Sequence, residues 1–240
     1  MKAETDSEKD FFDCECPYCR KEVSFPKEWT GTIQACLWCA QNFVIPYGPS
    51  ETPKAVSLEI RTERLLLRRL KVTDTSDLLE FLSDKNSLMY SDMRTMTQEE
   101  VDGWLAADTK SEPCLNPSLD TYFGIELLAE PKLIALVSFE YRGERFKGAG
   151  FDLVVNKQFR RQGYGTEIVR GVLEFAFERA NLHRVAMGCC SEDTAGLRMF
   201  AKAGLRREGE LIESRLLNGK WMNMTVVAML QWEWNQSAST

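Results

Sequence analysis

The sequence predicts a mixed α/β domain preceded by a small cysteine-rich module. Three observations predict this arrangement. Strand-sized apolar runs alternate with amphipathic helical segments from about residue 56 onward. A glycine-containing loop joins a strand to a helix near the middle of the chain, and two C-x-x-C pairs precede residue 46. The length of 240 residues suits one full domain with a small appendage.

The larger domain is expected to begin with a strand and to end with a hairpin. Thr97 and Glu100 can form a capping box at a helix start, Gly204 suits a left-handed helix end, and Asn218-Gly219 is a strong hairpin turn. In chain order, we expect a strand over 58–70, helices near 74–83 and 97–107, strands over 121–129, 132–142 and 149–155, a helix over 165–180, a strand over 184–190, a helix over 194–203, and two closing strands.

Composition and charge argue against several classes of protein. The chain is 44% hydrophobic with a net charge of -6, which disfavours a general nucleic-acid binder. Its apolar runs are far shorter than the ~20 residues that cross a bilayer, so we expect no membrane contact. The polar, acidic start of the chain does not resemble a signal peptide. We therefore expect a cytoplasmic protein whose cysteines are thiols or metal ligands.

The two C-x-x-C pairs predict a structural zinc site. Cys16 and Cys19 form one pair, Cys36 and Cys39 form the other, and sixteen residues separate the two pairs. Two such knuckles supply the four thiolates that tetrahedral zinc prefers, and they leave no open position for catalysis. The pattern resembles a zinc ribbon. Four unrelated buried cysteines and a redox dithiol are the alternatives.

The ribbon is expected to be a unit separate from the larger domain. We expect a disordered leader over 1–12, the zinc ribbon over 13–46, a linker over 47–56 and the main domain over 57–236. Residues 1–50 hold eight acidic and five basic side chains, which suits a protein or cationic partner. The remaining cysteines are expected to be free thiols that do not bind the metal: Cys14, Cys114, Cys189 and Cys190.

The stretch from Arg160 to Thr166 predicts an anion-binding loop. It reads R-x-x-G-x-G up to Gly165, between a strand ending at Val155 and the start of a helix. Glycines let the backbone approach a ligand, and a helix N-terminus offers unpaired N–H groups and a positive dipole end. Arg161 and the Thr166 hydroxyl add charge and a donor. A turn without a ligand is the alternative, and the glycine spacing fits neither a Walker loop nor the dinucleotide fingerprint.

Several motifs together resemble the GNAT superfamily of N-acetyltransferases. R-x-x-G-x-G after a strand ending in Val resembles the acetyl-CoA motif of this superfamily. Residues 60–68 resemble the opening strand of its ribosomal-protein N-acetyltransferase branch, and residues 193–205 resemble the "N-x-x-S … E-K-x-G-F" helix of that branch. Residues 207–209, 218–221 and the Glu233-Trp234 end resemble its closing strands. The resemblance covers about 57–234.

This resemblance implies a mixed sheet, flanked by helices, that splays open between its fourth and fifth strands, with acetyl-CoA in the cleft. It implies that backbone groups of Leu153 and Val155 bind pantetheine and that residues 160–166 hold the pyrophosphate. Phe200 would lie beside the thioester sulfur, where many members carry a Tyr. The residues expected to bind the co-substrate are Leu153, Val154, Val155, Arg160, Arg161, Gly163, Tyr164, Gly165, Thr166 and Phe200.

Several positions depart from the family pattern where the chemistry is expected. Asp193 replaces an Asn, Gly196 replaces a Ser, and Arg215 stands where ribosomal-protein enzymes carry a catalytic Glu. Phe200 lacks the hydroxyl that could protonate the departing thiolate. The candidate catalytic groups are Asp152 and Asp193. For the former the alternative is a solvent-facing side chain, and for the latter a helix N-cap.

The function expected from these features is transfer of an acetyl group from acetyl-CoA to a primary amine. At pH 7.4 about 30% of an α-amine is neutral against about 0.1% of a lysine side chain, so weak base catalysis favours an α-amine such as a protein N-terminus. The acidic ribbon would help to dock the substrate protein. The alternatives are a non-catalytic acyl-CoA-binding or protein-interaction module, and a nucleic-acid adaptor that the acidity of the ribbon disfavours.

Overall fold

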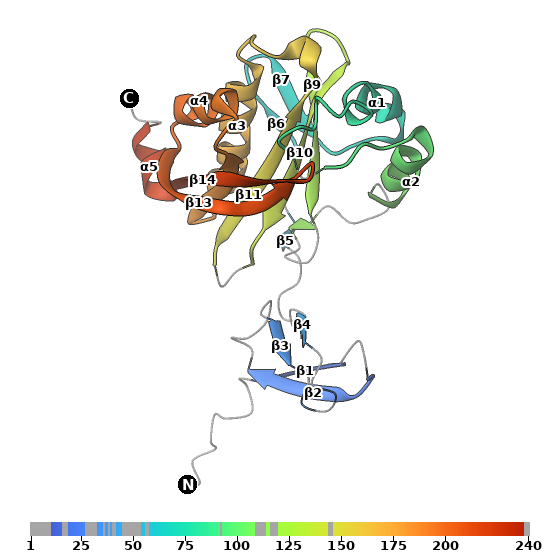
Figure 1. Ribbon diagram of the computed structural model, residues 1–240, viewed down its shortest axis with the longest axis vertical. Helices are drawn as coiled ribbons and strands as arrows, with labels where there is room; N and C mark the ends of the chain where they lie inside the picture. Colours follow the sequence, from blue (N-terminus) through green and yellow to red (C-terminus); the bar gives the residue numbers. More distant parts are fainter. Residues whose placement is uncertain are drawn as a thin grey trace.

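The computed structural model describes most of the chain (Figure 1). The described residues are 11–15, 19–26, 33–35, 37, 39, 42–44, 54–55, 58–91, 93–108, 114–115, 120–143 and 146–237. They contain an eight-stranded sheet with its helices and three small two-stranded sheets. No helix within these ranges is long and apolar enough to span a membrane.

The large sheet is mixed, as expected. Its strand order is β13-β14-β12-β11-β10-β9-β7-β6, and every neighbouring pair is antiparallel except β11 with β12. From the first edge to the second, the strands are β13 (Arg206–Leu217), β14 (Lys220–Leu230), β12 (Arg184–Cys190), β11 (Gly148–Val155), β10 (Leu133–Tyr141), β9 (Thr121–Leu127), β7 (Leu65–Arg68) and β6 (Ile60–Arg61).

The sheet opens between its two parallel strands. Within the described chain, β11 and β12 pair only through Gly148 with Arg184 and through Ala149 with Val185. The rest of β11 continues to pair with β10 as far as Val155. Residues 150–155 therefore have one paired neighbour strand and one open side, which agrees with the splayed sheet implied by the family resemblance.

Helices cover both faces of the sheet (Figure 1). On one face, the 3₁₀ turn η3 (Val72–Asp74), α1 (Thr75–Leu82) and α2 (Gln98–Asp108) enclose a core with side chains from β10 and β11. On the other face lie α3 (Tyr164–Glu174), which runs on into a π-helical turn (Phe175–Arg179), and α4 (Thr194–Ala203). The short α5 (Gln231–Ser237) follows β14. The predicted helices 74–83, 97–107, 165–180 and 194–203 are confirmed.

The segment 58–70 was predicted as one strand, and this is wrong. It forms a tight hairpin, in which β6 and β7 pair through Ile60 with Leu67. The turn closes when the Thr62 N–H donates to the Leu65 carbonyl at 2.9 Å. The alternation of apolar residues is typical of both arrangements, and contacts from α3 to this turn, described below, stabilise the hairpin.

A buried ion-pair network fixes the start of α1 against the sheet. The guanidinium of Arg68 donates two 2.8 Å hydrogen bonds to the two carboxylate oxygens of Asp74, and its Nε donates to Glu126 at 2.7 Å. The side chains of Arg68 and Asp74 are both less than 10% exposed. Removing one partner of such a pair would leave a buried charge without compensation and would be strongly destabilising.

The N-terminal part contains two short hairpins. One pairs β1 (Phe11–Glu15) with β2 (Glu22–Pro26), and the other pairs β3 (Ile33–Ala35) with β4 (Asn42–Val44). Residues 1–10 of the expected leader and most of the expected linker lie outside the described residues. Within the linker, β5 (Lys54–Ala55) pairs with β8 (Cys114–Leu115).

Candidate active site

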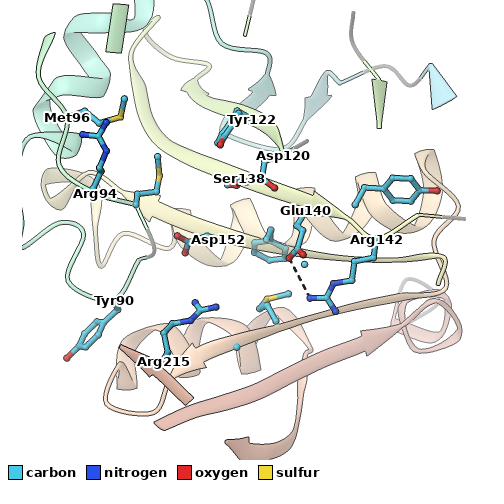
Figure 2. Close-up of a pocket in the computed structure, with 16 residues that line it drawn as sticks. Tyr90, Arg94, Met96, Asp120, Tyr122, Ser138, Glu140, Arg142, Asp152 and Arg215 are labelled. Carbon is cyan, nitrogen blue, oxygen red and sulfur yellow. Dashed lines mark hydrogen bonds and ion pairs between the residues drawn. The ribbon is translucent and has the colours of Figure 1, made fainter. Parts of the chain in front are cut away.

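A cavity of about 640 Å³ lies against the open part of the sheet (Figure 2). Its lining comes from β9, β10, β11, β12 and β13, and from the segment between α1 and α2. The charged side chains in the lining are three carboxylates and three guanidinium groups: Asp120, Glu140, Asp152, Arg94, Arg142 and Arg215. The polar lining and the location at the sheet opening make this cavity the candidate acceptor site.

Asp152 lies in the middle of this cavity, on the open part of β11 (Figure 2). Its Oδ2 accepts a hydrogen bond from the Ser91 hydroxyl, and its Oδ1 accepts from the Leu153 N–H at 2.9 Å. The side chain of Asp152 is half-buried rather than fully solvated. Two donors therefore hold its carboxylate in one orientation inside the cavity.

Successive residues of β11 direct their backbone N–H and C=O groups alternately toward β10 and toward the opening of the sheet. The Asn156 N–H donates to the Ile134 carbonyl on the β10 side at 2.9 Å. Because successive residues of a strand direct their backbone groups to opposite sides, Leu153 and Val155 direct theirs to the opening. Val154 directs its backbone groups to β10 and its side chain into the core under α1. Of the three strand residues predicted to bind the co-substrate, two are thus placed at the opening.

The predicted anion loop follows β11 directly and ends at the N-terminus of α3. Gly163 is the residue before the helix and has a φ of 87°, a left-handed conformation that side chains rarely adopt. Arg161 is also left-handed, with a φ of 63°. The N–H groups of the first helical turn, Tyr164 to Thr166, have no acceptor within the helix and are available to an anion.

Gly165 was expected to let the backbone approach the ligand, but its surroundings give another reason for a glycine at this position. A Cβ at this position would lie 2.6 Å from the Met199 sulfur of α4. The residue therefore allows α3 and α4 to pack closely.

Arg160 forms hydrogen bonds from the anion loop to the end of β11 and to the segment that follows α1. Its Nε donates to the Val155 carbonyl at 2.9 Å, and its terminal nitrogen donates to the Ser87 carbonyl at 3.2 Å. These bonds connect the end of β11, the anion loop and the segment that carries Ser91. Arg160 thus couples the loop to the cavity wall.

Arg64, in the turn between β6 and β7, clamps the same loop from the other side. Its guanidinium donates to the Gln162 carbonyl at 3.1 Å and lies 4.3 Å from the centre of the Tyr164 ring. Its Nε and backbone N–H both donate to the carboxylate of Glu167, at 2.7 and 2.8 Å. The Thr62 hydroxyl donates to the same carboxylate at 2.6 Å.

This clamp controls a charge beside the anion loop. Burial alone would raise the pKa of Glu167, but the hydrogen bonds from Thr62 and Arg64 and the charge of Arg64 outweigh it and leave the pKa below its usual value. Glu167 is therefore a carboxylate in the first turn of α3, where an anionic ligand would otherwise meet its negative charge. Arg64 compensates that charge.

We expect Arg64→Gln to weaken CoA binding about tenfold, on the order of 1.4 kcal/mol. The substitution removes the bond to the loop carbonyl and leaves the Glu167 charge without its ion pair. Isothermal titration calorimetry with CoA measures the effect. The matched control is Arg61→Gln, an exposed arginine three residues earlier whose carboxylate partner, Glu59, is 3.9 Å away. An unchanged CoA affinity in Arg64→Gln would contradict the role of Arg64 in holding the anion loop and compensating Glu167.

The structure places the two helix residues predicted for the site on α4. Phe200 is buried, with its ring 6.0 Å from that of Phe151 on β11, so it packs against the opened strand. Asp193 is the N-cap of α4, and its Oδ1 accepts from the Gly196 N–H at 2.9 Å. A Cβ at Gly196 would lie 2.4 Å from the Asp193 Oδ2 in this arrangement, so a larger residue there would require the Asp193 side chain to shift. Asp193 is not among the residues that line the cavity.

The two cysteines of β12 are buried thiols, as predicted. Burial, together with the nearby charges of Asp193, Cys190 and Asp152, raises the pKa of Cys189 to about 12. A thiol of that pKa stays protonated at neutral pH and is a poor nucleophile. Neither Cys189 nor Cys190 is among the residues that line the cavity, so neither is placed there to form a covalent acyl-cysteine.

Sequence reasoning missed Ser91, the Arg64–Glu167 pair and the positions of Arg94 and Arg142 on the cavity wall. Thr62 and Arg64 are 105 and 103 residues from Glu167, so no local pattern connects them. The local signal in the sequence is the Thr62-Glu63-Arg64 segment, which by itself resembles only part of an opening strand.

The anion loop and the cavity meet at the same strand. A long cofactor with its phosphates at the α3 N-terminus and its arm along the open side of β11 would have its acyl end toward the cavity that Asp152 lines. Such an arrangement would suit an acetyltransferase that uses acetyl-CoA. Residues 64–206 match the family described as Acetyltransferase (GNAT) domain, and the chain belongs to this family. It is an acetyl-CoA-dependent N-acetyltransferase, which favours the catalytic interpretation over a non-catalytic binding module.

Similar proteins share the domain. The chain is 28% identical over 179 residues to "Uncharacterized N-acetyltransferase YnaD" of Bacillus subtilis, which covers 74% of this chain and 100% of that protein. The ribosomal-protein-S5-alanine acetyltransferase of Vibrio fischeri has a TM-score of 0.63 at 19% identity, over 73% of this chain and 98% of that one. The spermidine N-acetyltransferase of Vibrio cholerae, in complex with CoA and spermine, has a TM-score of 0.63 at 18% identity, over 72% and 99%. The two solved structures share the fold.

Proposed function

We propose that this acetyltransferase acts on an α-amine, most simply the N-terminus of a protein or peptide, with Asp152 as the group that takes up the amine proton. The observation that carries the proposal is the position of Asp152, which is oriented by Ser91 in the cavity where the sheet opens. The N-cap role of Asp193 makes it the weaker of the two candidates.

The reaction proceeds by direct attack. The neutral amine nitrogen bonds to the acetyl carbonyl carbon, the C–S bond breaks, and CoA departs as its thiolate. The nitrogen becomes positively charged as the N–C bond forms, and its proton passes to the Asp152 carboxylate. A carboxylate is a weaker base than an amine, so it acts best after this bond has formed.

Because the Asp152 carboxylate acts only after the N–C bond has formed, the reaction favours an acceptor amine that is already neutral. An α-amine with a pKa near ~7.8 is roughly 300-fold more neutral at pH 7.4 than a lysine side chain near ~10.4. Phe200 has no hydroxyl with which to protonate the leaving thiolate. A thiol with a pKa near ~8.5 leaves readily as a thiolate, so the reaction does not depend on such an acid.

The test is a competition between two peptides. One has a free N-terminus and no lysine, and the other has a blocked N-terminus and one lysine. We expect faster CoA release and acetylation of the first, measured by thiol assay and mass spectrometry. Faster acetylation of the lysine peptide would overturn the α-amine proposal. Faster acetylation of spermidine than of either peptide would place the acceptor with that of the spermidine acetyltransferases.

We also propose that the N-terminal module is a zinc ribbon that helps to dock the substrate protein. Cys19 and Cys39 lie in the turns of the two hairpins and pack against the same small core of Cys14, Val23 and Phe25. Cys16 and Cys36 lie outside the described residues, and the described residues alone contain no group of three or more metal-binding side chains. The support is the sulfur donor set and the shared core of the two described cysteines. A reducing cytoplasm would keep the four thiolates available to zinc.

We expect about one zinc per chain by elemental analysis. Cys36→Ser should lower the zinc content and unfold the ribbon, because four sulfur ligands hold a module too small to fold on apolar burial alone. The main domain should keep its melting transition and its CoA affinity. Cys114→Ser is the control and should leave zinc unchanged. Loss of zinc in Cys14→Ser would instead make Cys14 a ligand, and collapse of the whole chain on chelation would contradict two separate units.

A further inference from the structure

One wall of the acceptor cavity is apolar. Met93, Met96 and Tyr122 line the cavity and pack, half-buried, against the core that α1 and α2 enclose. The ring of Tyr122 meets that of Trp104 on α2 edge-on, with 4.8 Å between the ring centres. The Met96 N–H donates to the Leu82 carbonyl at 3.0 Å, which holds the segment between α1 and α2 against α1. We call the side chains of Met93, Met96 and Tyr122 the apolar wall.

Tyr122 stands in the same row of the sheet as Asp152. Asp152 of β11 pairs with Ser138 of β10, and Ser138 pairs with Tyr122 of β9. Paired residues of antiparallel strands project to the same face, and all three side chains line the cavity. Two strand spacings put the backbone of Tyr122 roughly 10 Å from that of Asp152. Figure 2 shows Tyr122 and Met96 on the same side of Asp152.

Ser91 connects the carboxylate to the other end of the apolar wall. Its hydroxyl donates to Asp152 and accepts from the Met93 N–H at 3.1 Å. Met93 is therefore two residues from the group that orients the carboxylate. An acceptor amine at Asp152 would have the apolar wall beside the carbon that carries the amine.

Two charged side chains also border the apolar wall. Arg94 donates to the Glu100 carboxylate at 2.7 Å, so its charge is compensated. Asp120 accepts from the Ser138 hydroxyl at 3.2 Å and would favour a cationic side chain. Asp120 is exposed, and an exposed ion pair contributes less than the burial of a large apolar side chain. The apolar contact should therefore decide the preference.

We propose that the first residue of the acceptor has a long apolar side chain and that this side chain lies against the apolar wall. The proposal rests on the proposed function, because it needs an α-amine at Asp152. An amine nitrogen lies about 2.9 Å from the oxygen that it contacts, and an extended methionine side chain reaches about 6 Å beyond that nitrogen. Together these lengths nearly span the distance to Tyr122. Methionine side chains adapt to different apolar shapes, so we expect Met, Leu and Phe to be accepted alike.

The test uses lysine-free peptides that are identical except at their first residue, which is Met, Ala, Glu or Arg. Glu and Arg are at least as long as Met but charged, and Ala is apolar but too short to reach the wall. We expect kcat/KM for the Met peptide to exceed that for the Glu peptide at least about tenfold and that for the Ala peptide about fivefold. Most of the difference should lie in KM.

Met96→Gln keeps the length of the side chain and makes the wall polar. It should reduce the advantage of the Met peptide over the Ala peptide to less than about twofold, with an unchanged melting temperature. The matched control is Met89→Gln, which changes a methionine of the same segment that is 44% exposed and is not in the lining. It should keep the preference of the wild type.

Three results would overturn the inference and leave acetylation of α-amines intact. They are a higher kcat/KM for the Arg peptide than for the Met peptide, which would assign the first side chain to Asp120, equal values for the Met, Ala and Glu peptides, and a Met preference that survives Met96→Gln. Failure to acetylate the N-terminus of any peptide would instead count against the proposed function.

Discussion

Asp152→Asn is expected to lower kcat by about 100-fold at pH 7.4, the lower end of what a positioned general base contributes. Asparagine keeps the shape of the side chain and can still accept from Ser91, but it cannot take up the proton of the attacking amine. The affinity for CoA should be unchanged, because the anion loop is untouched. Stopped-flow or steady-state thiol release at saturating acetyl-CoA measures the loss.

Two comparisons make this prediction specific. Asp193→Asn keeps a good N-cap for α4, so it should reduce kcat only slightly if Asp152 is the base. The rates of Asp152→Asn and of the wild type should both rise with pH as more of the acceptor becomes neutral. A kcat for Asp152→Asn within threefold of the wild type would contradict the role of Asp152. A larger loss in Asp193→Asn would transfer that role to Asp193.

Gly163→Val is expected to weaken CoA binding by tenfold or more, at least about 1.4 kcal/mol. The φ of 87° at Gly163 is strained for any residue with a Cβ, at a cost of about 1–3 kcal/mol. A Cβ there would also lie 3.3 Å from the guanidinium of Arg64, which holds the loop. The loop would have to change shape, and its N–H groups would no longer converge on the pyrophosphate.

The control for this substitution is Gly219→Val. Gly219 has a similar φ of 80° but lies in the hairpin turn between β13 and β14, with nothing within 4 Å of an added Cβ. It should lose comparable stability without losing CoA affinity. Calorimetry and thermal melting separate the two effects. Equal CoA affinity in Gly163→Val and the wild type would mean that the pyrophosphate binds elsewhere.

Local signals in the sequence predicted the elements that surround the site. The α4 boundaries follow from Asp193 as N-cap and Gly204 as a left-handed C-cap with a φ of 102°. The closing hairpin follows from Asn218-Gly219, whose φ values are 50° and 80°. The strand–loop–helix order identified the anion loop. Each of these signals is contained in a few neighbouring residues, which is why the sequence alone was sufficient.

Features that depend on distant contacts could not be predicted in the same way. The strand predicted over 58–70 folds into a hairpin because Glu167, on α3, binds the turn at Thr62 and Arg64. The orientation of Asp152 depends on Ser91, 61 residues away. The irregular pairing by which Arg215 of β13, rather than Glu213, stands opposite Met222 of β14 is accompanied by a hydrogen bond from the Glu213 N–H to the Asn223 side chain. The periodicity of a single segment contains no information about these partners.

The most direct test of the account is a crystal structure with a bisubstrate ligand in which CoA is joined through an acetyl bridge to the α-amine of a short peptide. The account predicts the pyrophosphate at the N–H groups of residues 163–166, the pantetheine along the open side of β11, and the peptide nitrogen within hydrogen-bond distance of Asp152. A ligand bound with its peptide nitrogen outside the cavity, or with its phosphates away from the α3 N-terminus, would contradict it.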